Sequence, residues 1–161
     1  MTDAKAKLID LLTDFDNAML VTHSTDGGLD ARPMAIAEVA GDGDLWFATD
    51  RDSGKVAEVR ADDDVVVTMQ GGSKFVSLRG KCRVVDDREK IHHLWREPWR
   101  VWFPGGKEDP SITLLHVDAT DGEYWDNSGV EGVKYLVKAG WAYVRGERAE
   151  TDSQINAEAK L

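Results

Sequence analysis

The stretch from Asp44 to Arg60, DLWFATDRDSGKVAEVR, constrains the fold most, because three kinds of local structure follow one another within it. Its apolar and aromatic start, Leu45 to Thr49, predicts a strand, and the Asp-Arg-Asp-Ser-Gly segment that follows is typical of a turn. Lys55 to Val59 then has the apolar spacing of a short amphipathic helix. A strand, a turn and a helix in this order bring hydroxyl groups, backbone N–H groups and a cation to one point.

This arrangement predicts a small anion site and favours phosphate as its ligand. The first N–H groups of a helix lack intrahelical acceptors and lie at the positive end of its dipole. Gly54 allows close approach to the backbone, Lys55 adds a charge, and Thr49 and Ser53 supply neutral donors. The alternative is an ordinary helix start, in which Asp52 or Ser53 caps the backbone and Lys55 is solvated.

The bulk composition is that of a soluble globular protein. At 161 residues, with 42% hydrophobic and 31% charged side chains, the chain is expected to form one domain, residues 1–148, and a flexible polar tail, residues 149–161. The net charge of −10 repels polyanions, so we expect neither nucleic acid nor membrane as a partner. The single Cys82 and the absence of a signal-peptide pattern lead us to expect the cytoplasm.

Hydrophobic periodicity predicts a mainly β chain with peripheral α-helices. Helices are expected over residues 2–15, 55–59, 86–95 and 131–143. Strands are expected over residues 18–22, 29–40, 45–49, 65–69, 74–85, 112–117 and 122–126. The short turns indicate antiparallel pairing, and the two long strands favour a small barrel over an open sheet, because long strands can bend around its corners.

Arg32-Pro33-Met34 lies in the middle of the predicted strand 29–40, where proline cannot donate a ladder hydrogen bond. One interpretation is an edge strand blunted by Pro33, with Arg32 solvated. The other is that backbone groups of residues 33–35 face a planar ligand, while Arg32 supplies a second cation for the phosphate of that ligand. The residues alone leave both open.

Four large aromatic side chains crowd the loop-rich segment 98–110 and the helix before it: Trp95, Trp99, Trp102 and Phe103. They can form a satellite hydrophobic cluster. They can also form a subunit interface or a wall beside an aromatic cofactor, since loop tryptophans often serve as anchors. The pattern slightly favours the second interpretation.

Several common kinds of site find no support in the sequence. His92 and His93 are adjacent, so their rings diverge on a helix, and His23 and His116 lie on separate predicted strands. With one cysteine, this pattern does not predict a zinc site. The motifs of the α/β-hydrolases, of Rossmann domains and of P-loop proteins are missing. We predict no catalytic side chain and no metal ligand.

Taken together and in order, five segments resemble a known family. They are Arg32-Pro33-Met34; Leu45 to Thr49 with Ser53 and Lys55; Phe75-Val76-Ser77-Leu78-Arg79-Gly80; Trp102-Phe103-Pro104-Gly105-Gly106 with Asp109-Pro110; and Glu123-Tyr124-Trp125-Asp126. The chain from about residue 8 to residue 145 resembles the general stress protein branch of the pyridoxamine 5′-phosphate oxidase-like superfamily. Each segment is a weak signal, but their joint occurrence is specific.

The resemblance implies an FMN-binding split β-barrel that works as a homodimer, with flavin in clefts between the subunits. It implies that Arg32, Ser53 and Lys55 hold the FMN phosphate, with Thr49 nearby. The remaining residues that the resemblance assigns to the flavin cleft are Pro33, Met34, Phe47, Ala48, Phe75 and Trp102. Among these, Phe75 replaces a glutamine that the oxidases supply from the partner subunit, and Trp102 would be a wall across the subunit boundary.

The departures from the oxidase pattern concern the substrate. Ala37 stands where the oxidases have a phosphate-binding lysine, and Gly54-Lys55 stands where they have Arg-Lys. Their Ser-Arg-Pro and Ser-Gln-x-Gly segments are missing. We therefore expect an FMN-dependent, or FAD-dependent, oxidoreductase that takes a small-molecule electron donor or acceptor. A non-catalytic flavin sensor or buffer is the alternative, and a vitamin B6 oxidase is less favoured.

Overall fold

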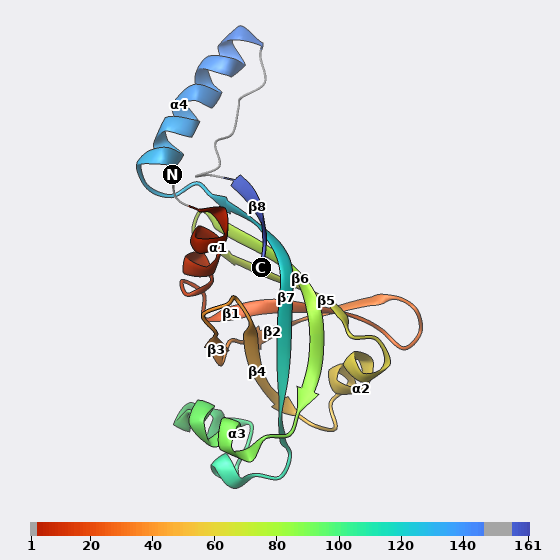
Figure 1. Cartoon of the computed structure of the whole chain (residues 1–161). Coiled ribbons are helices and arrows are strands. Elements are labelled where there is room, and N and C mark those ends of the chain that lie inside the picture. Colours follow the sequence, from red (N-terminus) through yellow and green to blue (C-terminus); the bar gives the residue numbers. More distant parts are fainter. Residues whose placement is uncertain (1–2, 147–155) are drawn as a thin grey trace.

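The computed structural model of the chain describes residues 3–146 and 156–161 (Figure 1). The strands of the described residues form one antiparallel sheet in the order β2-β1-β5-β6-β7-β4-β3, and β8 pairs with β7. The strands are β1 (Asn17–His23), β2 (Leu29–Ala35), β3 (Glu38–Val39), β4 (Leu45–Asp50), β5 (Asp64–Gly71), β6 (Lys74–Val85), β7 (Ile112–Asp126) and β8 (Asn156–Lys160).

The described helices are peripheral to this sheet. They are α1 (Ala4–Leu12), α2 (Gly54–Ala61), α3 (Arg88–Leu94), α4 (Gly129–Arg145) and the 3-10 helices η1 (Glu97–Val101) and η2 (Gly106–Glu108). Figure 1 shows β1 and β2 running across the long strands β6 and β7, so that the sheet curls into a half-open barrel. The predicted mainly β, split-barrel fold with peripheral helices is confirmed.

The main core lies inside the curled sheet. Alternate side chains of each strand point inward, as the period-two pattern of β1 and β5 requires, and fully buried examples are Leu20, Val67 and Leu78. Helix α1 covers this core with Leu8 and Leu12, which are also fully buried. Burial of each such side chain contributes about 1.5–3 kcal/mol.

A second, smaller core lies at the end of the barrel where β6 leads into α3 (Figure 1). Its buried members are Ala37, Ile91, Leu94, Trp99, Phe103, Ile112 and Leu114. Here the segment 98–110, called the aromatic loop below, folds back over the ends of β4 and β7. This core fixes the loop that borders the candidate site.

Two strand predictions are wrong. The predicted strand 29–40 is broken into β2 and β3, because the chain changes its hydrogen-bonding partner there. The N–H of Ile36 bonds to Asp16, next to β1, whereas the N–H of Ala37 bonds to Trp46 in β4. The predicted pair 112–117 and 122–126 is one continuous strand, β7, which follows β6 along its whole length. Gly122, where the second of these strands was predicted to begin, allows close packing within β7, because a Cβ there would lie 2.5 Å from Leu78 Cδ2.

The C-terminal segment also differs in part from its prediction. Residues 156–160 form β8, paired with β7 from Asp121 to Trp125, where a frayed tail was expected. Residues 149–155, the rest of the expected tail, lie outside the described residues. The predicted helix 131–143 is present as α4, which projects away from the barrel (Figure 1). None of the described helices is long and apolar enough to span a membrane.

Candidate functional site

Lys55 is the centre of the candidate site. It lies in the first turn of α2, and its Nζ donates a hydrogen bond to Oγ1 of Thr49 at 3.1 Å. Partial burial, followed by the nearby charge of Arg32, lowers the pKa of Lys55, while Asp50 and Glu58 act in the opposite direction. A partly desolvated cation beside a second cation is an environment that an anion would stabilise.

Arg32 is the second cation, and other side chains of the chain hold it in place. From β2 its guanidinium reaches across β1 to α2, where Nη2 lies 2.8 Å from Oε2 of Glu58. Its Nη1 donates to Oγ1 of Thr22 at 2.6 Å and to the carbonyl oxygen of Leu20 at 3.3 Å. Arg32 is therefore neither solvated nor mobile, contrary to the first interpretation of the Arg-Pro-Met segment.

β2 is the last strand on its side of the sheet, so Pro33 does lie on an edge strand, as that interpretation required. The edge position of Pro33 is thus confirmed, and the solvated Arg32 of the same interpretation is wrong. Pro33 cannot donate a backbone hydrogen bond to a further strand at this edge. The same residue lines a cavity together with Met34 and Ala35.

No side chain caps the start of α2. Ser53 occupies the N-cap position, but its Oγ donates to the carbonyl oxygen of Asp50 at 2.7 Å and makes no cap hydrogen bond. The carboxylate of Asp50 accepts from the backbone N–H of Asp52 at 2.8 Å and so braces the turn. The ordinary helix start with a Ser53 cap and a solvated Lys55 is not what the structure shows.

Beside Lys55 lies a cavity of about 430 Å³, which is within the usual size range of small-molecule sites. Its lining residues are Pro33, Met34, Ala35, Ala48, Thr49, Asp50, Lys55, Trp99, Trp102 and Phe103. Lys55, Thr49 and the acidic Asp50 form its polar part, and the other lining residues are apolar or aromatic. Trp99 and Phe103 are buried in the second core, whereas Trp102 at the mouth is 67% exposed.

The cavity brings together six of the residues assigned from the resemblance: Pro33, Met34, Ala48, Thr49, Lys55 and Trp102. Arg32 and Ser53 stand beside its polar part without lining it. Phe47 is fully buried in the main core, and Phe75 lies on the outer face of the sheet, paired with Trp125. Within one chain these last two therefore do not line the cavity.

Sequence reasoning missed two participants. Glu58 and Thr22 hold Arg32. Trp99, which the wall interpretation of the aromatic segment included, does line the cavity. For Glu58 a signal was available, because it follows Lys55 by three residues and so shares its face of α2. Thr22 offered no such signal, since its contact with Glu58 joins residues 36 positions apart.

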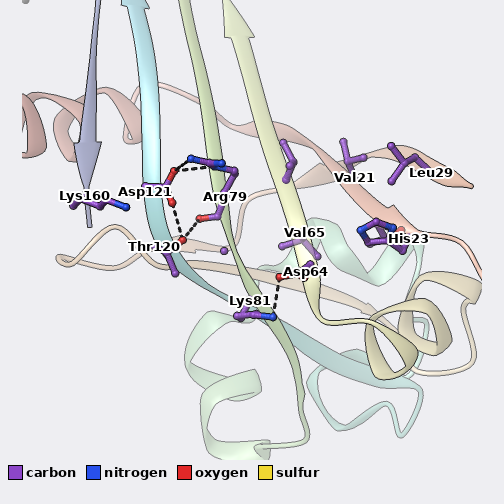
Figure 2. Close-up of a pocket in the computed structure, with 13 residues that line it drawn as sticks. Val21, His23, Leu29, Asp64, Val65, Arg79, Lys81, Thr120, Asp121 and Lys160 are labelled. Atoms are coloured by element: carbon purple, nitrogen blue, oxygen red, sulfur yellow. Dashed lines mark hydrogen bonds and ion pairs between the residues drawn. The ribbon is translucent and has the colours of Figure 1, made fainter. Parts of the chain in front are cut away.

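A larger hollow of about 490 Å³ crosses the outer face of the sheet (Figure 2). Four of its charged groups already pair with one another: Arg79 with Asp121, and Lys81 with Asp64 at 2.8 Å. Ion pairs satisfied in this way leave fewer groups for a ligand. For this reason, the cavity beside Lys55 is the better candidate.

In the part of the chain that the structure describes, no group of three or more His, Cys, Asp or Glu side chains could hold a metal ion. Cys82 is buried in the main core, and burial raises the pKa of its thiol to about 12. A thiol in this state is a poor nucleophile and a poor metal ligand.

Two known proteins are similar to this chain in sequence. General stress protein 26 of Bacillus subtilis is 25% identical over 125 residues, covering 74% of this chain and 86% of the relative. Protein bli-3 of Neurospora crassa is 26% identical over 129 residues, covering 73% of this chain. The matched part spans 62% of the length of bli-3.

Solved structures show the same fold. A protein from Jannaschia sp. CCS1 assigned to general stress protein 26 superposes with a TM-score of 0.75 at 24% identity, covering all of both chains. The general stress FMN/FAD binding protein of Xanthomonas citri has a TM-score of 0.66 at 29% identity, covering 78% of this chain and 90% of that chain.

The family model described as "Pyridoxamine 5'-phosphate oxidase like" matches residues 3–150, which is nearly the whole chain. This match includes both cations, the edge proline and the aromatic loop that form the candidate site. The chain therefore belongs to the pyridoxamine 5′-phosphate oxidase-like family.

Proposed function

We propose that this protein binds FMN in the cavity beside Lys55 and acts as a flavin-dependent oxidoreductase. The observation that carries the proposal is that one cavity is lined by the cation Lys55 and its partner Thr49 and also by apolar and aromatic side chains, Pro33 and Trp102 among them. FMN combines the two matching groups, a phosphate and a planar aromatic ring.

The residues present fit this cofactor. Lys55 can pair with the phosphate, and Arg32 adds a second positive charge close by. The backbone of Pro33 and Met34 and the ring of Trp102 would contact the flavin ring. The Xanthomonas citri relative is named as an FMN/FAD binding protein, which supports a flavin here, and FAD is the alternative ligand of the same site.

The bound flavin would supply the redox chemistry, accepting an electron pair from a reduced donor and passing it to an acceptor. The side chains of this chain have a smaller role, since they bind the phosphate, orient the ring and exclude water. We assign no catalytic acid or base, and the substrate is not specified by these residues.

Oxidation of vitamin B6 finds no support in the site. Ala37, which replaces the substrate-binding lysine of the oxidases, is only 3% exposed and is packed in the second core. A lysine at this position would have to bury its charge among Ile91 and Trp99, which is costly. At this position the chain therefore lacks the lysine with which the oxidases bind the phosphate of the vitamin.

We also propose that the protein is a homodimer with the flavin near the subunit interface. The outer face of the sheet exposes Phe75 and Trp125, which are cross-strand partners, each 36% exposed. Met19, also exposed, is the partner of Pro33 on the same edge of the sheet. Since Pro33 belongs both to this face and to the cavity lining, a second copy seated here would cover the mouth of the cavity.

The direct test is a titration of purified, flavin-stripped protein with FMN, FAD and riboflavin, followed by flavin fluorescence. Saturation near one FMN per chain is expected, and the absence of saturation with any flavin would contradict the proposal. The loaded protein is then mixed with NADH or NADPH and an acceptor such as a quinone. Steady consumption supports an oxidoreductase, whereas tight binding without turnover supports a sensor or buffer. Cell fractionation tests the proposed cytoplasmic location.

A further inference from the structure

We infer that Glu58 positions Arg32 for the ligand phosphate and thereby sets the preference of the site for phosphorylated over unphosphorylated flavin. The inference rests on the proposed flavin function. Glu58 lies in the middle of α2, does not line the cavity, and is an acidic residue beside a site for an anion. The geometry around it explains this apparent contradiction.

Three groups form a closed triangle of short contacts. Oε2 of Glu58 accepts from Nη2 of Arg32 at 2.8 Å and from Oγ1 of Thr22 at 2.6 Å. Thr22 in turn accepts from Nη1 of Arg32 at 2.6 Å and is fully buried. The guanidinium is thus fixed by two side chains on two different elements, α2 and β1.

The triangle leaves part of the guanidinium available. Nη1 of Arg32 donates to Thr22 and to the carbonyl oxygen of Leu20, and Nη2 donates to Glu58. Nε makes no hydrogen bond to the described part of the chain. A guanidinium has five N–H donors, and these three hydrogen bonds use at most three of them, so donors remain for a phosphate.

The carboxyl group of Glu58 is ionised in the folded chain. The hydrogen bond from Thr22, and then the charge and hydrogen bond of Arg32, lower the pKa of its carboxyl group. Both partners of the ion pair are largely shielded from solvent, with side chains of Arg32 and Glu58 that are 19% and 12% exposed. Removal of the carboxylate would leave the arginine charge without compensation and Nη2 without its acceptor, so that only the contacts of Nη1 would still hold the guanidinium.

The charge of Glu58 also lets two cations stand close together before the ligand arrives. Arg32 lowers the pKa of Lys55, which shows that the two positive charges repel each other, and Glu58 opposes that effect. Glu58 and Lys55 lie three residues apart on one face of α2, so the carboxylate sits beside both cations. A site organised in this way loses less conformational entropy when it binds phosphate.

The opposite role is physically possible and predicts the opposite sign. If Glu58 only competed with the ligand phosphate for Arg32, its removal would strengthen FMN binding. The positioning role predicts that removal weakens FMN binding, and that it leaves riboflavin, which lacks the phosphate, nearly unaffected.

The experiment measures the dissociation constants of FMN and riboflavin for wild type, Glu58→Ala, Glu58→Gln and Thr22→Val. The matched control is Glu89→Ala, which removes an exposed glutamate from α3 with the same change in net charge. We expect Glu58→Ala to weaken FMN binding about tenfold, with a smaller effect for Glu58→Gln, which keeps an acceptor oxygen. If thermal unfolding shows that Glu58→Ala does not fold, the dissociation constants of Glu58→Gln and Thr22→Val are compared with those of wild type instead.

A double-mutant cycle separates positioning from general damage. If Glu58 acts through Arg32, adding Glu58→Ala to Arg32→Ala should cause no further loss of FMN affinity. Equal losses for FMN and riboflavin, additive losses in the cycle, or tighter FMN binding would each overturn the inference while leaving the flavin function intact. If wild type binds neither flavin, the proposed function fails, and this inference fails with it.

Discussion

Nζ of Lys55, at the start of α2, donates a hydrogen bond to Oγ1 of Thr49, at the end of β4, over 3.1 Å. This contact joins the two elements that the intervening turn connects, and it directs the lysine into the cavity. Thr49 is buried, so the hydroxyl acceptor is fixed, and the ammonium group keeps two further N–H donors. The pair therefore holds a partly desolvated cation at the polar part of the site.

Replacement of Lys55 by alanine should weaken FMN binding much more than riboflavin binding. Only FMN carries the phosphate, and a charge-assisted contact of this kind contributes about 1.5–3 kcal/mol, or roughly 10- to 100-fold in affinity. Fluorescence titration of the two flavins against wild type and Lys55→Ala measures the difference. Lys55→Arg is the control, because it keeps the charge. Equal losses for the two flavins would place Lys55 away from the phosphate.

Lys55 should also reduce the stability of the flavin-free protein. Its pKa is lower in the folded chain than the ordinary value of 10.5, so the charged form opposes folding at neutral pH. This opposition is largest below the folded pKa and fades as the pH rises toward the ordinary value. Lys55→Met should therefore raise the melting temperature at neutral pH and raise it less at about pH 10.

Differential scanning fluorimetry without flavin measures both values. Lys107→Met, at an exposed lysine of η2, is the matched control and should change neither. An unchanged melting temperature for Lys55→Met would mean that the lysine is as well stabilised in the folded chain as in water.

The sequence was sufficient for the local structure of the site and insufficient for its long-range contacts. The apolar run, the turn and the lysine of residues 44–60 predicted β4, the turn and α2, because each signal is local. The pairing of Arg32 with Glu58 joins residues 26 positions apart and depends on how β1, β2 and α2 pack. No periodicity in one strand or one helix contains that information.

The aromatic loop illustrates the same division. Its composition predicted either a hydrophobic cluster or a wall beside a cofactor, and the structure shows that one segment both forms a cluster and lines the cavity. Trp99 falls within η1 and is buried, whereas Trp102 follows η1 and is exposed at the cavity mouth. Side-chain direction within a short 3-10 helix depends on its backbone geometry, which the residue types do not specify.

The bulge between Arg79 and Gly80 should be intolerant of any side chain. A Cβ at Gly80 would lie 2.3 Å from the backbone carbonyl oxygen of Asp118, and backbone cannot move away as a side chain can. We expect Gly80→Ala to reduce the free energy of unfolding by about 1–3 kcal/mol, the usual cost of overpacking. Urea unfolding measures this. Gly41→Ala, where nothing lies within 4 Å of the added Cβ, should be neutral.

A charge on the outer face of the sheet should dissociate the proposed homodimer. Phe75→Glu would place a carboxylate beside Trp125, in the middle of the surface that a second copy would cover, and the unpaired charge could not be buried there without a large cost. We expect the mass measured by light scattering after size-exclusion chromatography to fall from that of a dimer to that of a monomer. Ala6→Glu, on the exposed face of α1, is the matched control and should stay dimeric.

The same variant connects assembly with the cofactor. If the second copy covers the mouth of the cavity, FMN affinity should fall in Phe75→Glu, although Phe75 lines no part of the cavity within its own chain. In wild type, FMN affinity should then decrease when the protein is diluted below the dimer dissociation constant. A monomeric wild type, or a Phe75→Glu dimer of unchanged mass, would contradict the proposed interface. A monomeric variant that binds FMN as tightly as wild type would show instead that one chain forms the complete site.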